Sequence, residues 1–407
     1  MNNNTIKAIA MAGLMAAPIL AAENAPQTGD ILQDINMFNP GDGDPAYKVK
    51  ANDKFGTQWG VDVAYGYWGT SKALPGTNGK NNYALLHAQL NQRLIEDNAN
   101  GGTWLRVEVS GSWGLDRSTA RTSDEEGTDF VSGYGTATDV HGDIWGPHNL
   151  YLPEVALMHY FAGKRACIIA GMVNLTNYFD AVGIANDSFA SFSNTGFMNS
   201  TVLDMPDSNA GAILQVELNS RNYVMVGFSR ETTDAGYDPF NAHGSNYMVV
   251  GEYGHVFGEG DAVLRINPFY RHVEVENGNG ELRSRQNAGL AASIEYTPCD
   301  AITLFARAGF GARQDLGPAA DFSCGANVHL FPSREDDFFG IAYGVFKGNT
   351  ADEKPVHNRE QVLEVMYSFQ VNDYVKIVPH YQYIHNPAYR ADSRDASLFG
   401  VQAVLSF

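Results

Sequence analysis

The sequence has 407 residues, of which 44% are hydrophobic, and carries a formal net charge of −19 at pH 7. So acidic a protein is not expected to bind nucleic acid, and its electric field favours cations. The 22 Phe, 20 Tyr and 42 Gly residues accompany repeated two-residue alternation and little helical periodicity, a combination typical of an all-β protein.

The N-terminus has the form of a secretory signal peptide. Lys7 precedes an apolar stretch from Ala8 to Leu20, and two small residues follow it. The stretch is too short to span a membrane as a helix, and its pattern matches an export signal. We therefore predict export through a signal peptide that is cleaved after Ala22.

Segments with the length and alternation of β-strands recur along the rest of the chain. They are expected at 55–69, 82–95, 103–114, 150–161, 165–173, 209–218, 222–230, 246–257, 261–275, 284–296, 301–312, 321–331, 337–347, 359–371, 374–385 and 397–407. Tight links such as "AGK" (162–164) and "ND" (372–373) follow even-numbered strands, whereas the longest links, at about 115–149 and 174–208, follow odd-numbered ones. Short turns that alternate with long loops indicate an outer-membrane β-barrel.

The predicted fold is therefore an all-β, transmembrane antiparallel β-barrel of about 16 strands, with short periplasmic turns and long extracellular loops. It divides the chain into a signal peptide (1–22), a periplasmic N-terminal segment (23–54) and an outer-membrane β-barrel (55–407). A soluble β-sandwich or propeller also contains many short strands, but neither explains the alternation of link lengths.

Charged side chains test the alternation, because a Lys or Arg on the lipid face near mid-membrane costs about 2–4 kcal/mol. In "DAITLFARAGFGAR" (300–313), Leu304 and Ala308 share one face, and Arg307 lies on the other. Apolar and charged side chains fall on opposite faces in four further segments: "TWLRVEVSGSW", "AVLRINPFYRHV", "NAGLAASIEY" and "QVLEVMYSFQV". The faces cannot be assigned in "LPEVALMHYF" and "NYMVVGEYGHVF". The polar faces are expected to line an aqueous lumen, since a barrel of this size leaves a channel.

The last segment, "LFGVQAVLSF", has the alternation of a lipid-facing strand. Phe399, Val401, Ala403, Leu405 and Phe407 share its apolar face. We predict that this strand closes the cylinder. Its terminal aromatic residue resembles the signal by which the barrel-assembly machinery recognises outer-membrane barrels.

The cysteines and histidines give no sign of a disulfide or a metal site. A hairpin turn near Leu316 would place Cys324 opposite Ala308, ~30 Å along the strand from Cys299. Cys167 is the third cysteine, and we expect no disulfide among the three. His141, Asp143 and His148 lie close together in sequence, but their spacing matches no familiar metal site, and neither a metal nor a cofactor is expected.

The stretch "AGMVNLTNYFDAVGIANDSFASFSNTGF" (170–197) resembles the carbohydrate-selective porins of the OprB type, in which an "AGK-x-D" strand runs into "TNYFD" and an Asn/Asp- and Phe-rich loop. The tail segments "DDFFGIAYG" (336–344) and "EVMYSFQVNDYVKIVPHYQYIHNP" (364–387) support the resemblance, which covers roughly residues 150–407. Met172 and Asn174 stand where relatives often have Lys and Asp, so the charge preference of the channel can differ.

The resemblance implies a porin that gives sugars passive diffusion across the outer membrane, in contact with membrane lipid and without covalent chemistry. A sugar has apolar faces and a rim of hydroxyl groups, so a matching constriction would offer aromatic, amide, carboxylate and guanidinium groups. We expect the loop 174–208 to fold inward and narrow the lumen. The candidate pore residues are Asn174, Asn177, Tyr178, Phe179, Asp180, Asn186, Asp187 and Phe189 on the loop, and Arg106, Glu108, Arg265, Arg271 and Arg307 on the wall.

Several alternatives remain open. The loop could only cap the mouth, with its Asn and Asp residues serving turns, and the wall arginines could pair with Glu108, Glu295 and Glu364 for structure alone. The channel could be a general or cation-preferring porin, and the 115–149 loop could serve adhesion or phage reception. An outer-membrane hydrolase would need a nucleophile beside a base, for which His243 and Ser245 are the nearest pair in sequence. The sugar that passes, and the choice between a monomer and a homotrimer, are left open.

Overall fold

The structure is a computed structural model that describes residues 30–37, 46–70, 79–115, 136–144, 148–206, 208–231, 246–258, 260–276, 282–348, 350, 355–389 and 395–407. Within these residues sixteen antiparallel strands form one closed barrel, in which each strand pairs with its neighbours in sequence. The predicted signal peptide, and His243 and Ser245 of the hydrolase alternative, lie outside the described residues.

The strands lie where the two-residue alternation predicts them, with ends that differ by a few residues. In chain order they are β1 (Thr57–Thr70), β2 (Lys80–Ile95), β3 (Thr103–Gly114), β4 (His148–Phe161), β5 (Ala166–Val173), β6 (Asn209–Asn219), β7 (Asn222–Arg230), β8 (Tyr247–Phe257), β9 (Ala262–Glu276), β10 (Leu282–Cys299), β11 (Ile302–Gly311), β12 (Ala320–Val328), β13 (Phe338–Phe346), β14 (Glu360–Asn372), β15 (Val375–His385) and β16 (Asp395–Ser406). The predicted fold class is confirmed.

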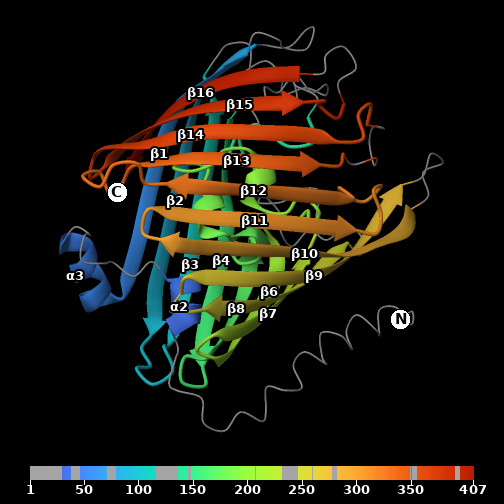
Figure 1. Cartoon of the computed structure of the whole chain (residues 1–407). Helices are drawn as coiled ribbons and strands as arrows, with labels where there is room; N and C mark the ends of the chain where they lie inside the picture. Colours follow the sequence, from blue (N-terminus) through green and yellow to red (C-terminus); the bar gives the residue numbers. More distant parts are fainter. Residues whose placement is uncertain are drawn as a thin grey trace.

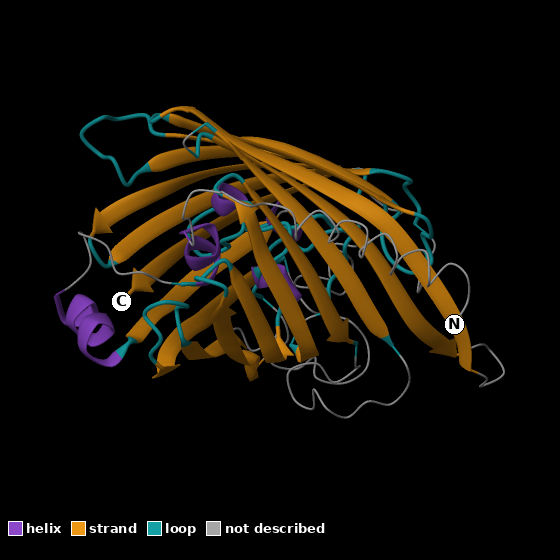
Figure 2. Ribbon diagram, turned by 90° about the horizontal axis from the view of Figure 1, so that it is seen from below, coloured by secondary structure: helices purple, strands orange, loops and turns teal. Residues whose placement is uncertain are grey.

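The pairing of β1 with β16 closes the barrel. Beyond the end of β16, Phe407 continues this pairing, since its N–H donates to the Val61 carbonyl (2.9 Å) and its carbonyl accepts from the Val61 N–H (3.1 Å). Closure gives every strand two partners and leaves no unpaired sheet edge. Figure 1 shows the ring of strands in chain order, and Figure 2 shows the same strands curving around the short helices inside.

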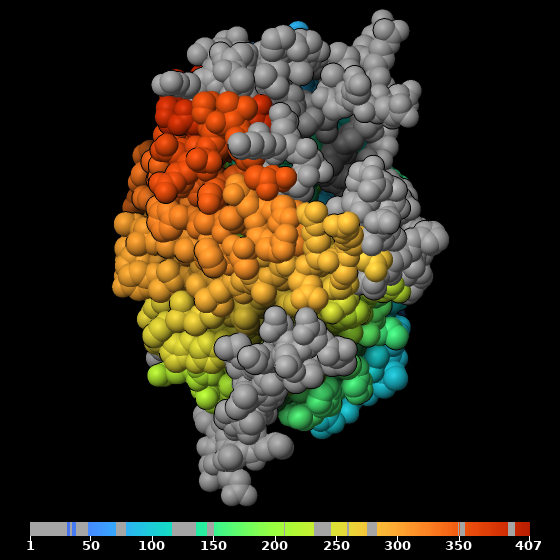
Figure 3. Space-filling view, turned by 90° about the vertical axis from the view of Figure 1, so that its right-hand side faces the viewer, coloured from blue at the N-terminus to red at the C-terminus, as the bar shows by residue number. Residues whose placement is uncertain are grey.

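Side chains alternate between the outer and inner faces of the wall. On β11 the Phe310 side chain is 66% exposed on the outside, whereas Arg307 is 2% exposed and points inward. The ambiguous segment of β8 resolves in the same way, with Val250 and Glu252 buried inside. Figure 3 shows the outer wall as a continuous surface from the red C-terminal strands to the green ones. The apolar outside therefore suits lipid, and the charged side chains lie within.

The register of the β11–β12 hairpin differs from the sequence expectation. Cys324 lies opposite Ala306, not Ala308, because the pairing is centred on Asp315 rather than on Leu316. A shift of one residue in a turn moves the facing pair by two. Asp315 accepts hydrogen bonds from the Arg313 side chain, which stabilises the earlier turn. The cysteines Cys167, Cys299 and Cys324 are all free.

Short helices complete the described chain. The link between β5 and β6 contains η4 (Leu175–Asn177), η5 (Gly183–Ala185) and α4 (Thr195–Met198). Before the barrel lie α2 (Asp30–Asn36) and α3 (Ala46–Phe55). α3 sits beside the start of β1, where the Lys48 ammonium lies 5.0 Å from the centre of the Trp59 ring (Figure 1). Among the described helices, none has both the length and the apolar character needed to cross a bilayer.

Candidate pore constriction

The loop between β5 and β6 turns inward through local hydrogen bonds at its start. The Asn174 side chain accepts from the Thr176 N–H (3.2 Å) and from the Thr176 hydroxyl (2.7 Å), and so caps η4. In Figure 1 the green helices of this loop lie within the ring of strands, behind β11 to β13. Asn174 thus serves the local turn as the N-cap of η4, and the residues that follow it contact the inner wall.

The first wall contact of the loop is with β3 and β4. The Asn177 amide donates to Glu108 (2.8 Å) and to Glu154 (3.1 Å), while the Tyr178 hydroxyl donates to Glu154. Burial raises the pKa of Tyr178, so its phenol stays protonated and remains a donor at neutral pH. Two loop residues therefore donate hydrogen bonds to two carboxylates of the inner wall.

Further polar groups surround the same carboxylates. Arg106 Nε lies 3.3 Å from Glu154 Oε2, and both side chains are almost wholly buried. His87 Nε2 lies 2.5 Å from Glu108 Oε1, and the Gln89 amide donates to the same oxygen (2.9 Å). His87 and Gln89 are only partly buried, so this edge of the cluster remains accessible from the interior.

A second wall contact joins the loop to β11. Asp180 Oδ2 lies 2.8 Å from Arg307 Nε, and the guanidinium also donates to the carbonyls of Phe197 (2.6 Å) and Met198 (3.0 Å). The Asp180 N–H donates to Glu252 of β8 (2.8 Å). One arginine on the wall therefore holds two separate parts of the loop, and the pairing with Asp180 offsets the cost of burying its charge.

A third wall contact is made on β14. Glu364 accepts from the Ser193 N–H (3.0 Å), the Ser193 hydroxyl (2.9 Å) and the Asn194 N–H (3.1 Å). His380 Nδ1 lies 2.9 Å from the same carboxylate. Backbone N–H groups of the loop thus satisfy this carboxylate, whose ion-pair partner within the described residues is His380 and not one of the wall arginines.

A second extracellular segment, residues 136–144, packs against the loop. The Gly142 N–H donates to the Ser193 carbonyl (2.9 Å), and His141 Nε2 lies 3.2 Å from Gln402 Oε1 of β16. Burial lowers the pKa of His141 to about 4, so its ring is neutral at physiological pH. The two segments therefore form one assembly that contacts strands on different sides of the barrel.

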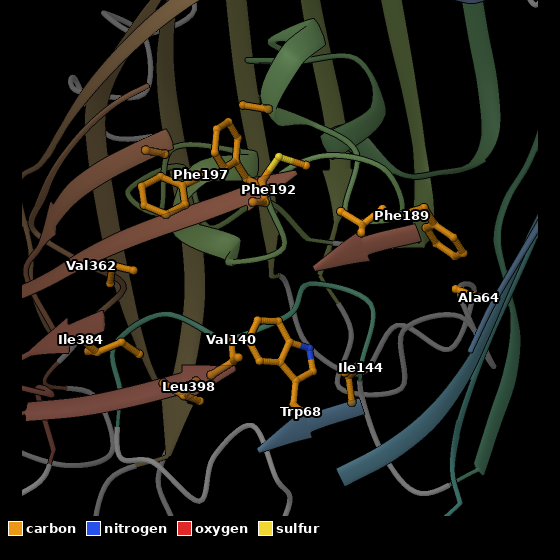
Figure 4. Close-up of a cluster of buried hydrophobic side chains, with 14 of the residues drawn as sticks. Ala64, Trp68, Val140, Ile144, Phe189, Phe192, Phe197, Val362, Ile384 and Leu398 are labelled. Carbon is orange, nitrogen blue, oxygen red and sulfur yellow. The ribbon is translucent and has the colours of Figure 1, made fainter. Parts of the chain in front are cut away.

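Buried aromatic side chains of the loop belong to a hydrophobic cluster inside the barrel, in which Figure 4 labels Phe189, Phe192 and Phe197. The ring of Phe192 lies 5.8 Å from Phe197 and 5.9 Å from Phe305, and Phe197 lies 6.1 Å from Phe346. Gly196 leaves room for this packing, because a Cβ there would lie 2.4 Å from the Phe346 ring. Burial of these rings holds the loop by the hydrophobic effect as well as by hydrogen bonds.

The remaining loop candidates occupy the far end of η5. Asn186 ends η5 and is half-buried, and Asp187 is exposed. The Asp187 carboxylate accepts from the Phe189 N–H (2.8 Å), which is a turn-forming role. The Phe189 ring lies 6.1 Å from the His87 ring and so joins the accessible edge of the first contact.

The other two wall arginines lie apart from the first contact. Arg271 donates to Asp204, near the end of the loop, to Glu231 beside β7 and to the Leu316 carbonyl (3.2 Å). Arg265 lies within electrostatic range of Glu252. Arg271 therefore contacts three extracellular links at once. Arg265 instead lies near Glu252, the wall residue that accepts from the Asp180 N–H.

Carboxylates gather around the accessible edge. Asp143 accepts a hydrogen bond from the Ser188 hydroxyl and lies within electrostatic range of His87, Asp187 and Glu108. The pKa of Asp143 is raised to about 6, mainly by burial, while His87 opposes the shift and the carboxylates of Asp187 and Glu108 add to it. Within the described residues, no group of three or more His, Cys, Asp or Glu side chains is arranged to hold a metal ion.

Comparison with known families decides what kind of barrel this is. Residues 114–407 match the family model described as carbohydrate-selective porin, OprB family. The chain belongs to this family. The match begins at the last residue of β3, so it includes the whole loop 174–208 but not Arg106 or Glu108.

Solved porins share the fold of this OprB-family chain. OprB of Pseudomonas putida, in its high-pH structure, matches with a TM-score of 0.69 and 15% identity over 89% of this chain and 96% of that one. The outer membrane channel DcaP of Acinetobacter baumannii matches with a TM-score of 0.54 and 9% identity over 86% and 97%. An uncharacterised protein of Aquifex aeolicus is 27% identical over 231 residues, which span 56% of this chain and 63% of that relative.

The sequence alone does not reveal several of the contacts inside this OprB-family barrel. Glu154 lies in a segment of ambiguous facing, and the partners of the loop on β14 and β16 are separated from it by more than a hundred residues. The two-residue alternation of side chains does identify Glu364 and Gln402 as interior groups. Glu295, which one alternative pairs with a wall arginine, accepts from the Gly183 N–H of the loop (2.7 Å).

Proposed function

We propose that this outer-membrane porin lets sugars and other small hydrophilic solutes diffuse passively through a water-filled lumen that the loop 174–208 narrows. The observation that carries the proposal is the set of loop contacts with three separate parts of the inner wall, at Glu108, Arg307 and Glu364. A loop that only capped the mouth would have no need of partners on β3, β11 and β14. Membership of a carbohydrate-selective family supports sugars as the solutes.

The accessible edge of the first contact offers the chemistry that a sugar needs. The half-buried His87 and Gln89 side chains present hydrogen-bonding groups, which the buried Glu108 carboxylate holds in place, and the Phe189 ring lies beside the His87 ring. Hydroxyl groups of a passing sugar would exchange hydrogen bonds with the polar groups while an apolar sugar face slides past the rings. Such contacts are weak and replaceable, which passage requires, and no covalent step is involved.

A cation-preferring porin is a second candidate. It is favoured by the carboxylates near Asp143, since Asp187 and Glu108 both lie within electrostatic range of Asp143. Carboxylates in a narrow passage raise the local concentration of cations. A reversal potential measured in a salt gradient gives the sign of this preference, and block of the current by monosaccharides or oligosaccharides tests sugar binding independently.

Deletion of residues 177–187 tests the proposed constriction. Removing Asn177, Tyr178 and Asp180 breaks the contacts with β3, β4 and β11, so single-channel conductance should rise and larger sugars should enter liposomes faster. The matched control is Glu335→Ala in an exposed periplasmic turn, which should conduct as the native protein does. An unchanged conductance and size limit in the folded deletion variant would show that the loop does not narrow the lumen.

A further inference from the structure

Helix α2 lies against the inner face of the barrel wall. The Leu32 N–H donates to Glu217 (2.9 Å), and the Asn36 amide donates to Gln215 (2.6 Å). Gln215 and Glu217 alternate on β6 with Leu214, which is exposed on the outer face, so both acceptors point inward. Leu32 and Asn36 are themselves fully buried. The helix therefore occupies part of the interior cross-section.

The apolar side of α2 explains why so short a helix is stable there. A free helix of seven residues is not expected to form in water, since nucleation is costly and few hydrogen bonds follow. Leu32 packs in a buried cluster with Trp104, Tyr160 and Ile169, while Ile31 and Ile35 pack against the edge of that cluster. The helical form of α2 therefore depends on its seat inside the barrel.

The C-terminal end of α2 reaches the network that holds the loop. The Asn36 carbonyl accepts from Asn91 (3.2 Å) and from Arg106 (3.3 Å). A helix C-terminus carries partial negative charge, which favours a guanidinium beside it. Arg106 also pairs with Glu154, to which the loop residue Asn177 donates. One chain of contacts thus joins the N-terminal segment, the wall and the loop 174–208.

We propose that α2 is a second constriction of the same pore, placed toward the periplasmic end, and that it positions Arg106 for the first constriction. The proposal rests on the proposed function. Nothing in the sequence pattern or the family description assigns α2 a role in solute passage. α2 acts in series with the loop: the loop restricts solutes that enter from outside, and α2 restricts their exit and fixes the Arg106 guanidinium.

Deletion of residues 30–37 tests this role in the full barrel. Single-channel conductance should rise by about twofold or more, and the swelling rate of liposomes with trisaccharides should rise more than the rate with monosaccharides. Lys50→Ala on α3, where the side chain is exposed, is the control and should leave both unchanged. Native conductance and native sugar selectivity in the folded deletion variant would overturn the proposal.

Two further variants keep the test decisive if that deletion does not assemble. Leu32→Glu places a carboxylate in the buried apolar cluster that holds α2 and should undock the helix, with the same rise in conductance. Asn36→Cys with Gln215→Cys, in a background whose native cysteines are replaced by alanine, should form a disulfide and conduct as the native protein does. Failure to cross-link, or a conductance that falls on oxidation, would contradict a helix resident in the lumen.

The loop deletion separates the two proposals. If α2 has no role but the loop does, deletion of 177–187 raises conductance and deletion of 30–37 does not. If neither deletion changes conductance, the proposed constriction itself is wrong. If both raise it and the double deletion raises it further, two restrictions in series are supported.

Discussion

Arg307 Nε on β11 lies 2.8 Å from Asp180 Oδ2 of the loop, and both side chains are almost wholly buried. Buried ion pairs add little net stability when intact, but removing one partner leaves an uncompensated charge. Arg307 also donates to carbonyls of residues 197 and 198, so it holds two turns of the loop at once. The pair is therefore the clearest single attachment between loop and wall.

Arg307→Ala should loosen the loop. Leaving Asp180 buried without its cation is expected to lower the free energy of unfolding by about 3–5 kcal/mol. The loss is measured as a lower midpoint of guanidinium unfolding in detergent. Single-channel recordings should become noisier as the loop moves. The control is Arg313→Ala, whose exposed pair with Asp315 is expected to contribute about 0–1 kcal/mol. Equal effects from the two substitutions would mean that Arg307 does not anchor the loop.

Glu108→Gln should weaken sugar binding in the pore. Glu108 accepts from Asn177 and Gln89 and lies beside His87, and hydrogen bonds to a charged acceptor contribute about 1.5–3 kcal/mol. Loss of the carboxylate charge should loosen the Gln89 and His87 side chains that it holds, so the concentration of sugar that halves the current should rise. The control is Glu96→Gln, at an exposed side chain, which should leave the concentration of sugar that halves the current unchanged. Native block by sugar in the Glu108 variant would place the binding groups elsewhere.

The cation preference should fall on acidification. Since the pKa of Asp143 is raised to about 6, this carboxyl is mainly ionised at about pH 8 and mainly protonated at about pH 5. The reversal potential in a salt gradient should therefore move toward zero between these values. Asp143→Asn removes this titration and should flatten the profile. A profile that is equally steep in the variant would assign the titration to other groups.

Val401→Arg should destabilise the barrel in lipid. Val401 lies on the outer face of β16, where it is 43% exposed, and a lipid-facing arginine is expected to cost about 2–4 kcal/mol near mid-membrane. Reversible folding into lipid vesicles, followed by guanidinium titration, measures the loss. The control is Glu335→Arg in an exposed turn, which should change the free energy of unfolding much less. The same small cost at both positions would argue that the β16 outer face does not contact lipid.

The alternation of side chains predicts the wall of this protein well, because each strand needs one apolar and one polar face whatever its partners are. Arg307 and Glu364 are placed inside by parity alone. Their partners are not predictable in the same way. Arg307 meets the Asp180 segment across 127 residues of sequence, and Glu364 meets Ser193 across 171. Such pairs depend on how the loop folds in three dimensions.

Short elements carry too little sequence signal to be predicted. The seven residues of α2 are helical only because the barrel interior receives Leu32 and Asn36, so no local pattern indicates them. The two-residue error at Cys324 has a similar origin, since local contacts of Asp315 set the centre of that turn. Whether the candidate pore residues contact solute stays a prediction for the experiments above.

The seam between β1 and β16 joins the segment that is translated early to the segment that is translated last. Without the pairing of β1 with β16 the sheet would have two bare edges, each able to pair with a strand from another polypeptide. Folding of this protein therefore requires that both edges stay protected from foreign strands until they pair with each other.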